Sequence, residues 1–308
     1  MSKTVFLFSG QGSQYVGMGR ELAEAYPDVK VYEKASEILG FDLAEKIGGS
    51  SEEELAKTVI AQPAIMATSL TAFEILRLEG IEFSAVAGHS LGEYAAMVAA
   101  GILSFEDGFK VIKARAEAMQ KAAEAASGAM YAIIGKPAEE IEAVCAEIDG
   151  YVVPVNYNSS AQTVIAGETS AAEKAAAKFA EMGAKAVKLG VSSAFHSKLM
   201  QPAAEEFEAA LRDMNPVFTK PSAEFYSNLT GAVQTDFEDM PAKLAKHIVS
   251  PVKFTSELAA LQAAGYENFV ELGPNKVLTG LVKKTLKGVN AVNVENAKTL
   301  EKALELLK

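Results

Sequence analysis

The sequence contains a single cysteine, Cys145, among its 308 residues. One thiol excludes an internal disulfide and any cysteine-rich metal site. Cys145 also lies among apolar residues at helical spacing, where an unpaired cysteine fills the core. We therefore expect no function for it, and no metal ion or redox cofactor is implied by the chain.

No transmembrane segment is evident either. The first apolar run, Val5–Phe8, is too short for a signal peptide and is followed by glycines instead of a cleavage site. The hydrophobic fraction of 49% and the charged fraction of 22% are ordinary for a globular protein. We expect a cytoplasmic protein that binds no membrane and forms one large domain or two smaller ones.

Basic residues are in deficit, and the net charge of −11 disfavours binding to nucleic acid or to an anionic membrane. One segment differs: between Leu272 and Val294 there is no acidic residue. Its lysines are Lys276, Lys283, Lys284 and Lys287. This segment either receives an acidic partner or presents one solvated face of a helix, and both interpretations stay open.

Nucleotide-binding fingerprints are lacking as well. Gly10 and Gly12 follow an apolar strand, but position 15 is Tyr, so G-x-G-x-x-G is not completed. No Walker G-K-[ST] motif occurs. The glycines still allow main-chain N–H groups to approach a ligand closely.

Apolar patterns predict strands near residues 4–10 and 83–90, and helices near 62–80 and 91–101. This alternation favours a parallel α/β core. Residues 128–191 then predict the order β-α-β-β-α-β, which is the ferredoxin-like arrangement. We expect a small inserted domain over 127–197, interrupting a large domain formed by 1–126 and 198–308.

The motif Gly88-His89-Ser90-Leu91-Gly92 has the form G-x-S-x-G. Because a predicted strand precedes it and a predicted helix follows, the context suits a nucleophile elbow that exposes the Ser90 hydroxyl. The N–H of Leu91, at the start of that helix, is placed to face an oxyanion. The alternative is that Ser90 only caps the helix.

A serine nucleophile needs a base, and the chain has three histidines. His89 neighbours Ser90 in the sequence, but on a sharp turn its side chain should point away from the Ser90 hydroxyl. His196 lies where the predicted insert returns to the large domain, in a loop suited to line a cleft, and we favour it over His247. No acidic residue stands out as a third triad member, but a carbonyl acceptor can also orient an imidazole.

Arg115 lies on or beside the apolar stripe of a helix that begins near Ser104. A buried guanidinium is costly without an anionic partner. Near a serine nucleophile it suits a substrate with a free carboxylate, held by two parallel hydrogen bonds. An internal salt bridge to Asp or Glu is an equally open interpretation.

Six motifs together carry a family resemblance, and they cover residues 4 to about 290. In order they are FSGQGSQ, GHSLGEYAA, RAEAMQ, VNYNSSAQTVIAG, AFHS and ELGPNKVLTGL. With these motifs the chain resembles the malonyl-CoA:acyl carrier protein transacylases. The resemblance implies an α/β-hydrolase-like core with a parallel sheet, a ferredoxin-like insert, and an active site in the cleft between them.

The resemblance also implies roles for particular residues. Ser90 would carry the malonyl ester, His196 would be the base, and Arg115 would hold the malonyl carboxylate. The main-chain N–H groups of Gln11 and Leu91 would bind the oxyanion. A carbonyl of the HIVSPV segment would orient the imidazole, which accounts for the missing acid.

Three positions depart from the family pattern: Ala116 replaces the usual Gly, Asn275 stands within the usual G-P-G, and His247 replaces a frequent Gln. We include His247 among the expected substrate-binding residues because it adds a second titratable group near the site. Phe195 matches the malonyl-selective form of the A-F-H motif.

The expected reaction transfers malonyl from malonyl-CoA to the phosphopantetheine thiol of holo-acyl carrier protein by a ping-pong mechanism, for fatty-acid synthesis. The lysine segment would receive the carrier protein. The alternatives are a serine esterase or thioesterase, a related acyltransferase of polyketide synthesis, and a non-catalytic acyl-binding module.

Overall fold

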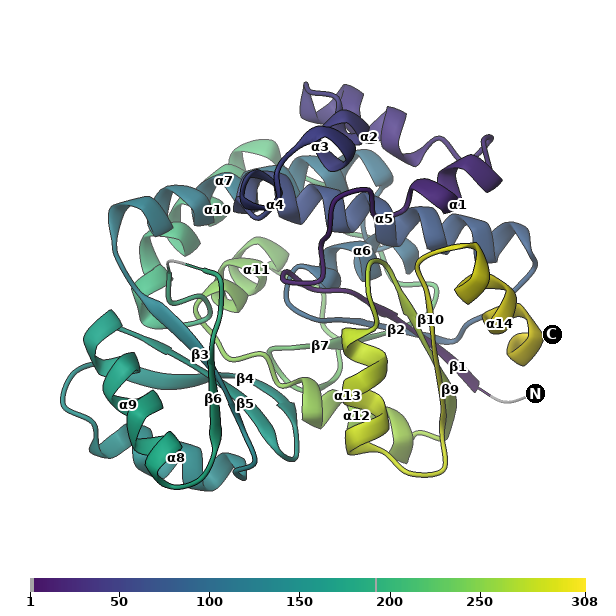
Figure 1. Ribbon diagram of the computed structural model, residues 1–308. Helices are drawn as coiled ribbons and strands as arrows, with labels where there is room; N and C mark the ends of the chain where they lie inside the picture. Colours follow the sequence, from purple (N-terminus) through teal and green to yellow (C-terminus); the bar gives the residue numbers. More distant parts are fainter. Residues whose placement is uncertain (1–2, 192) are drawn as a thin grey trace.

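The computed structural model describes residues 3–191 and 193–308, which form two sheets with helices packed around them (Figure 1). The larger sheet has six strands. Their spatial order is β10 (Asn290–Val294), β9 (Tyr266–Leu272), β1 (Lys3–Phe8), β2 (Ala85–Gly88), β7 (Glu224–Ser227) and β8 (Ala232–Val233). The first five run parallel and β8 is antiparallel. The predicted parallel α/β core is confirmed, with one antiparallel edge.

Strand β1 is central because its apolar residues are buried on both faces of the sheet. Phe6 and Phe8 pack into the core that holds α5 (Thr58–Leu78), α6 (Gly92–Ala99) and α7 (Phe105–Ala125). Val5 and Leu7 point the other way, toward α12 (Phe254–Ala263) and α13 (Val277–Thr285). The carboxyl end of β1 therefore emerges between two helical layers.

Helix α5 is long and apolar enough to cross a membrane by length and composition alone, with a hydropathy of 1.5. However, 89% of that window is buried inside the protein. Its apolar residues cover all sides of the helix because they pack against the large sheet and against neighbouring helices. We therefore assign α5 to the protein core.

The smaller sheet has four antiparallel strands (Figure 1). Their spatial order is β4 (Val152–Ser159), β5 (Gln162–Gly167), β3 (Ala129–Ile134) and β6 (Lys185–Lys188). Helices α8 (Ala138–Glu147) and α9 (Thr169–Glu181) share a core with Ile133 and Ile165 on one face. An isolated parallel bridge between Asn156 and Val252 joins β4 to the segment that precedes α12.

Short helices cover the remaining surface. They are α1 (Arg20–Ala25), α2 (Val31–Leu39), α3 (Leu43–Gly49), α4 (Glu52–Leu55), the 3-10 turn η1 (Lys198–Met200), α10 (Gln201–Met214), α11 (Met240–Ile248) and α14 (Ala297–Leu307). Of these, α11 supplies part of the site described next.

Candidate active site

The Gly88–Gly92 turn is too tight for side chains at its two glycines. A Cβ on Gly88 would lie 2.1 Å from the carbonyl carbon of Gly92, and a Cβ on Gly92 would lie 2.1 Å from the oxygen of Phe8. Between them Ser90 takes a left-handed conformation, with φ of 54°. Such a backbone is strained for a residue with a Cβ and is typical of functional turns. The predicted strand–turn–helix context is confirmed.

The Ser90 hydroxyl does not cap helix α6, whose N-cap residue is Leu91. Ser90 Oγ instead lies 2.7 Å from His196 Nε2. His196 Nδ1 lies 3.0 Å from the carbonyl oxygen of His247 and 3.2 Å from that of Ser250. Since Nδ1–H must donate to these carbonyls, Nε2 carries the lone pair that accepts the serine proton.

His196 is buried, with 3% of its surface exposed. Burial and the positive charge of Arg115 lower the pKa of His196 to about 3. The imidazole is therefore neutral at physiological pH, which is the form that a general base requires.

Arg115 lies on α7, the helix that Ser104 caps by accepting a hydrogen bond of 3.0 Å from the N–H of Asp107. Its side chain is fully buried. Its Nη2 donates to Ser90 Oγ at 3.1 Å, and its guanidinium lies 5.2 Å from the centre of the Tyr94 ring. Within residues 3–191 and 193–308, Arg115 forms no ion pair with a carboxylate. The guanidinium charge is thus left for another anion.

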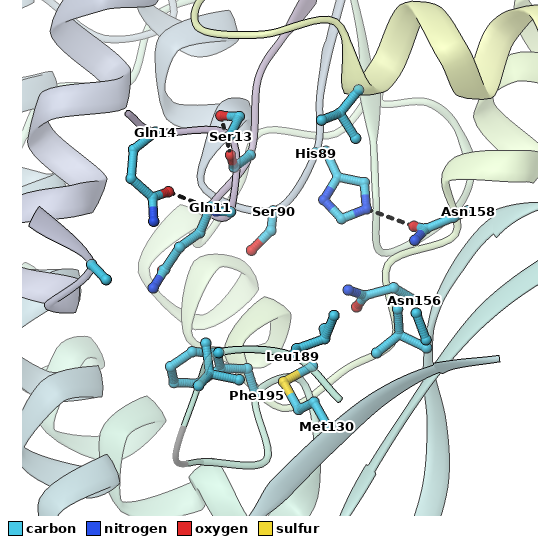
Figure 2. A pocket seen from close by; sticks show the side chains of 18 of the residues that line it. Gln11, Ser13, Gln14, His89, Ser90, Met130, Asn156, Asn158, Leu189 and Phe195 are labelled. Atoms are coloured by element: carbon cyan, nitrogen blue, oxygen red, sulfur yellow. Dashed lines mark hydrogen bonds between the residues drawn. The ribbon is translucent and has the colours of Figure 1, made fainter. Parts of the chain in front are cut away.

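A pocket of about 620 Å³ opens above the Ser90 hydroxyl, and Figure 2 shows its lining. One wall is the glycine-rich loop with Gln11, and the other comes from the smaller sheet, including Met130 and Asn156. The pocket therefore lies between the two sheets. His89 is directed across it, with Nε2 2.8 Å from Asn158 Oδ1, and makes no hydrogen bond to Ser90 in the described chain.

Gln11 and Leu91 each keep a main-chain N–H without an acceptor in the described part of the chain. Gln11 lines the pocket, and its side-chain oxygen accepts from Gln62 Nε2 at 3.2 Å. Leu91 directly follows Ser90 at the start of α6. Two main-chain N–H groups without acceptors near a reactive hydroxyl are the components of an oxyanion hole.

The His247 ring is placed differently from our expectation. It is 1% exposed and is not among the described residues that line the pocket. Its centroid lies 5.3 Å from that of His196, and its hydrogen bond to His196 is made through its carbonyl. Arg115 is likewise buried and outside that lining, but its Nη2 contacts Ser90 Oγ, whereas the His247 side chain contacts neither Ser90 nor the imidazole nitrogens of His196 in the described chain. We therefore do not propose a substrate contact for the His247 side chain.

Sequence reasoning missed two buried residues, Asn228 and Glu93. Asn228 Oδ1 accepts from the N–H of Ser90 at 2.7 Å, and its Nδ2 donates to the carbonyl of Gly88 at 2.7 Å. Glu93 accepts from the N–H of Asn228 at 2.5 Å and is 2% exposed. The only sequence signal was an acid within a helix of small apolar residues.

These groups define a class of protein: a strained serine on an elbow, a neutral imidazole and two free N–H groups belong to enzymes that form an acyl-serine. Comparison with known proteins agrees. The model of the acyl transferase domain family matches residues 5–303. The chain therefore belongs to the acyl transferase family.

Relatives and solved structures narrow the resemblance. The malonyl CoA-acyl carrier protein transacylase of Bacillus subtilis strain 168 is 41% identical, over 100% of this chain and 98% of its own. That of Escherichia coli K12 is 38% identical, over 99% and 100%. The Clostridium perfringens transacylase structure has a TM-score of 0.94 at 38% identity, covering 99% and 97%. A type II PKS acyl carrier protein complexed with its malonyl-transacylase gives 0.94 at 37%, covering 99% and 100%. The resemblance stated from the sequence is confirmed.

Proposed function

We propose that this protein transfers the malonyl group from malonyl-CoA to the phosphopantetheine thiol of acyl carrier protein, for fatty-acid synthesis. The observation that carries the proposal is the contact of one hydroxyl, Ser90 Oγ, with both a neutral imidazole and a free guanidinium. The first contact supports acyl transfer, and the second supports an acyl group with its own carboxylate. The named relatives are transacylases of this kind.

The first half-reaction follows from the contacts at Ser90. His196 Nε2 takes the hydroxyl proton as Ser90 Oγ attacks the thioester carbonyl. The N–H groups of Gln11 and Leu91 hold the oxyanion. Collapse of the tetrahedral intermediate breaks the C–S bond, and CoA leaves as a thiol with the proton from His196. The malonyl group remains as an ester on Ser90.

The second half-reaction reverses these steps with a new thiol. His196 takes the proton of the phosphopantetheine thiol, and the sulfur attacks the malonyl ester. The oxyanion again accepts from the same two N–H groups. Ser90 then leaves and recovers its proton from His196. The carbonyls of His247 and Ser250 keep the imidazole in one tautomer throughout.

The carrier protein docks on the lysine segment in this proposal. Lys276, Lys283, Lys284 and Lys287 are exposed, and none forms an ion pair in the part of the chain that the structure describes. Val277, Leu278 and Leu281 of the same segment line the pocket. A negatively charged partner bound there would therefore place its thiol-bearing arm beside the pocket mouth.

Charge reversal tests this docking surface. The Lys283→Glu and Lys284→Glu double variant should raise the KM for acyl carrier protein and leave the KM for malonyl-CoA unchanged. Lys302→Glu, an exposed change on α14, is the matched control. An unchanged KM for the carrier protein would favour the solvated-face interpretation.

We also infer the finer fold assignment. The order β4-β5-β3-β6, with α8 and α9 on one face, supports a ferredoxin-like insert at 127–197. The five parallel strands and the elbow at Ser90 support an α/β-hydrolase-like domain formed by 1–126 and 198–308.

We propose the cytoplasm as the location of the protein, because its first apolar run is too short for a signal peptide and is followed by glycines.

Intact-protein mass spectrometry after mixing with malonyl-CoA, without an acceptor, tests the function. The parent should gain one malonyl group, and Ser90→Ala should gain none. CoA release without an adduct would indicate an esterase or thioesterase. Equal ligand binding by both proteins, with neither adduct nor CoA release, would indicate an acyl-binding module. Transfer to holo-acyl carrier protein completes the test.

A further inference from the structure

Ser90 and His196 are both hydrogen-bonded to polar residues that do not line the pocket. On one side, Asn228 binds the N–H of Ser90 and the carbonyl of Gly88, the two sides of the elbow. On the other side, the carbonyl of His247 accepts from His196 Nδ1. Asn228 and His247 come from different parts of the chain, so a contact between them is needed to fix the distance that separates them.

Glu93 is the residue that touches both. Its Oε1 accepts from the N–H of Asn228 at 2.5 Å, and its Oε2 lies 3.1 Å from His247 Nδ1, although neither ring nitrogen of His247 makes a hydrogen bond of ordinary geometry in the described chain. We propose that Glu93 is a positioning residue that sets the distance between the Ser90 hydroxyl and the His196 imidazole by bridging Asn228 to His247. The proposal rests on the proposed function only in taking these two residues as nucleophile and base.

The chemistry of the bridge follows from its burial. Burial raises the pKa of Glu93 to about 8 and lowers the pKa of His247 well below its usual value. Both groups are therefore neutral at pH 7. A protonated carboxyl has one donor and one acceptor oxygen. Oε1 accepts from Asn228, and Oε2–H lies within reach of the unprotonated His247 Nδ1; in our proposal a small rotation of either side chain completes that hydrogen bond.

The role of the His247 ring can be compared with that of a glutamine at the same position. A glutamine keeps the carbonyl that orients His196, and its side-chain amide offers both a donor and an acceptor. The ring keeps the carbonyl and offers a nitrogen toward Glu93. In this proposal the side chain at position 247 anchors its own carbonyl, and through it the tautomer and direction of His196.

Two substitutions of similar size at Glu93 separate bridging from packing. Glu93→Gln retains an acceptor for Asn228 and a donor for His247, which reproduces the protonated acid. Glu93→Leu retains the volume and removes both hydrogen bonds. The readout is the rate of inactivation by phenylmethylsulfonyl fluoride, because this small reagent reports on serine reactivity without the malonyl carboxylate or CoA.

We expect Glu93→Leu to slow inactivation by at least about tenfold, since small misplacements of a reacting pair cost that much or more. Glu93→Gln should stay near the parent rate. Thermal unfolding establishes that each variant is folded, and Tyr32→Phe, which removes a buried hydrogen bond to Thr68 away from the pocket, is the control for lost stability alone. A folded Glu93→Leu protein that reacts at the parent rate would overturn the proposal.

If Glu93→Leu does not fold, substitutions at His247 test the proposed bridge instead. His247→Phe keeps the ring shape and the carbonyl but not the nitrogens, whereas His247→Gln restores an amide. We expect the Phe variant to lower kcat for malonyl loading with little change in KM, and the Gln variant to recover it. Equal kcat values for malonyl loading in the Phe and Gln variants would refute the proposed bridge. Failure of the parent to load malonyl would refute the proposed function instead, while the sulfonyl fluoride rates would still test the bridge.

Discussion

Arg115→Ala is the substitution that most directly tests the proposed choice of acyl group. The parent side chain is fully buried and reaches the reacting hydroxyl through Nη2, 3.1 Å from Ser90 Oγ. A hydrogen bond to a charged group contributes about 1.5–3 kcal/mol, and a guanidinium makes two to a carboxylate. The lower end of that range gives about 3 kcal/mol for the pair, which corresponds to about a hundredfold in rate.

The ratio of malonyl to acetyl loading isolates this contribution. Removing Arg115 also removes a donor to Ser90 Oγ, and that loss affects both acyl groups alike. Acetyl has no carboxylate, so its loading should fall only by the shared part. We therefore expect the malonyl-to-acetyl ratio of kcat/KM to fall by about a hundredfold.

The assay is single-turnover CoA release from malonyl-CoA and from acetyl-CoA, with thermal unfolding to establish that each variant is folded. Arg115→Lys is the matched control, because it keeps the charge but loses the planar pair of donors. It should give an intermediate ratio. Equal losses with the two substrates would show that Arg115 only supports the structure, and the carboxylate assignment would then be wrong.

Three further predictions concern protonation and backbone geometry. Because the pKa of His196 is lowered to about 3, kcat/KM for malonyl loading should show no inflection near pH 6.5; loss of activity with an apparent pKa there would contradict the lowered pKa of His196. Because folding raises the pKa of Glu93 to about 8, its contribution to stability is full below about pH 4.5 and is lost as the pH rises to 8. Glu93→Gln should therefore gain stability relative to the parent across that range in denaturant titrations, and a constant difference would argue against the raised pKa. Gly88→Ala should prevent folding of the elbow, whereas Gly48→Ala, within helix α3 and free of close contacts, should stabilise by up to about 1 kcal/mol; chemical denaturation compares the two.

The parallel core could be predicted because its signals are local. Apolar strands that end in glycine and long helices with clear stops alternate along the sequence, and each pattern needs only its own residues. The structure adds β10 and helices α1 to α4, which we did not predict individually. Strand β10 is an edge strand that is half-buried for most of its length. Helix α1 has Gly19 as its N-cap residue, without a side-chain cap, and has one buried residue. Such elements are fixed by their tertiary contacts.

The candidate site also contains residues that local motifs predict and residues that only tertiary contacts identify. Ser90, His196 and Arg115 were found because each lies in a motif with a characteristic neighbourhood, and the structure places all three in contact. Asn228 contacts Ser90 across 138 residues of sequence and has no motif of its own. Glu93 follows the nucleophile by three positions, but its burial depends on partners from α11 and from the segment just after β7. Only tertiary structure makes these roles visible.

Within the described residues no carboxylate contacts His196, and this fits the substrate that we propose. An ionised acid on Nδ1 would raise the pKa of the imidazole and would place a negative charge close to the malonyl carboxylate. Two carbonyls orient the ring without adding a charge. The nearby acid, Glu93, contacts His247 and not His196. It is protonated at neutral pH because burial raises its pKa. Arg115 cannot lose its proton in the same way. Among the residues contacting the reacting pair in the described chain, the guanidinium is then the one formal charge, and it is left free for the carboxylate of the incoming acyl group.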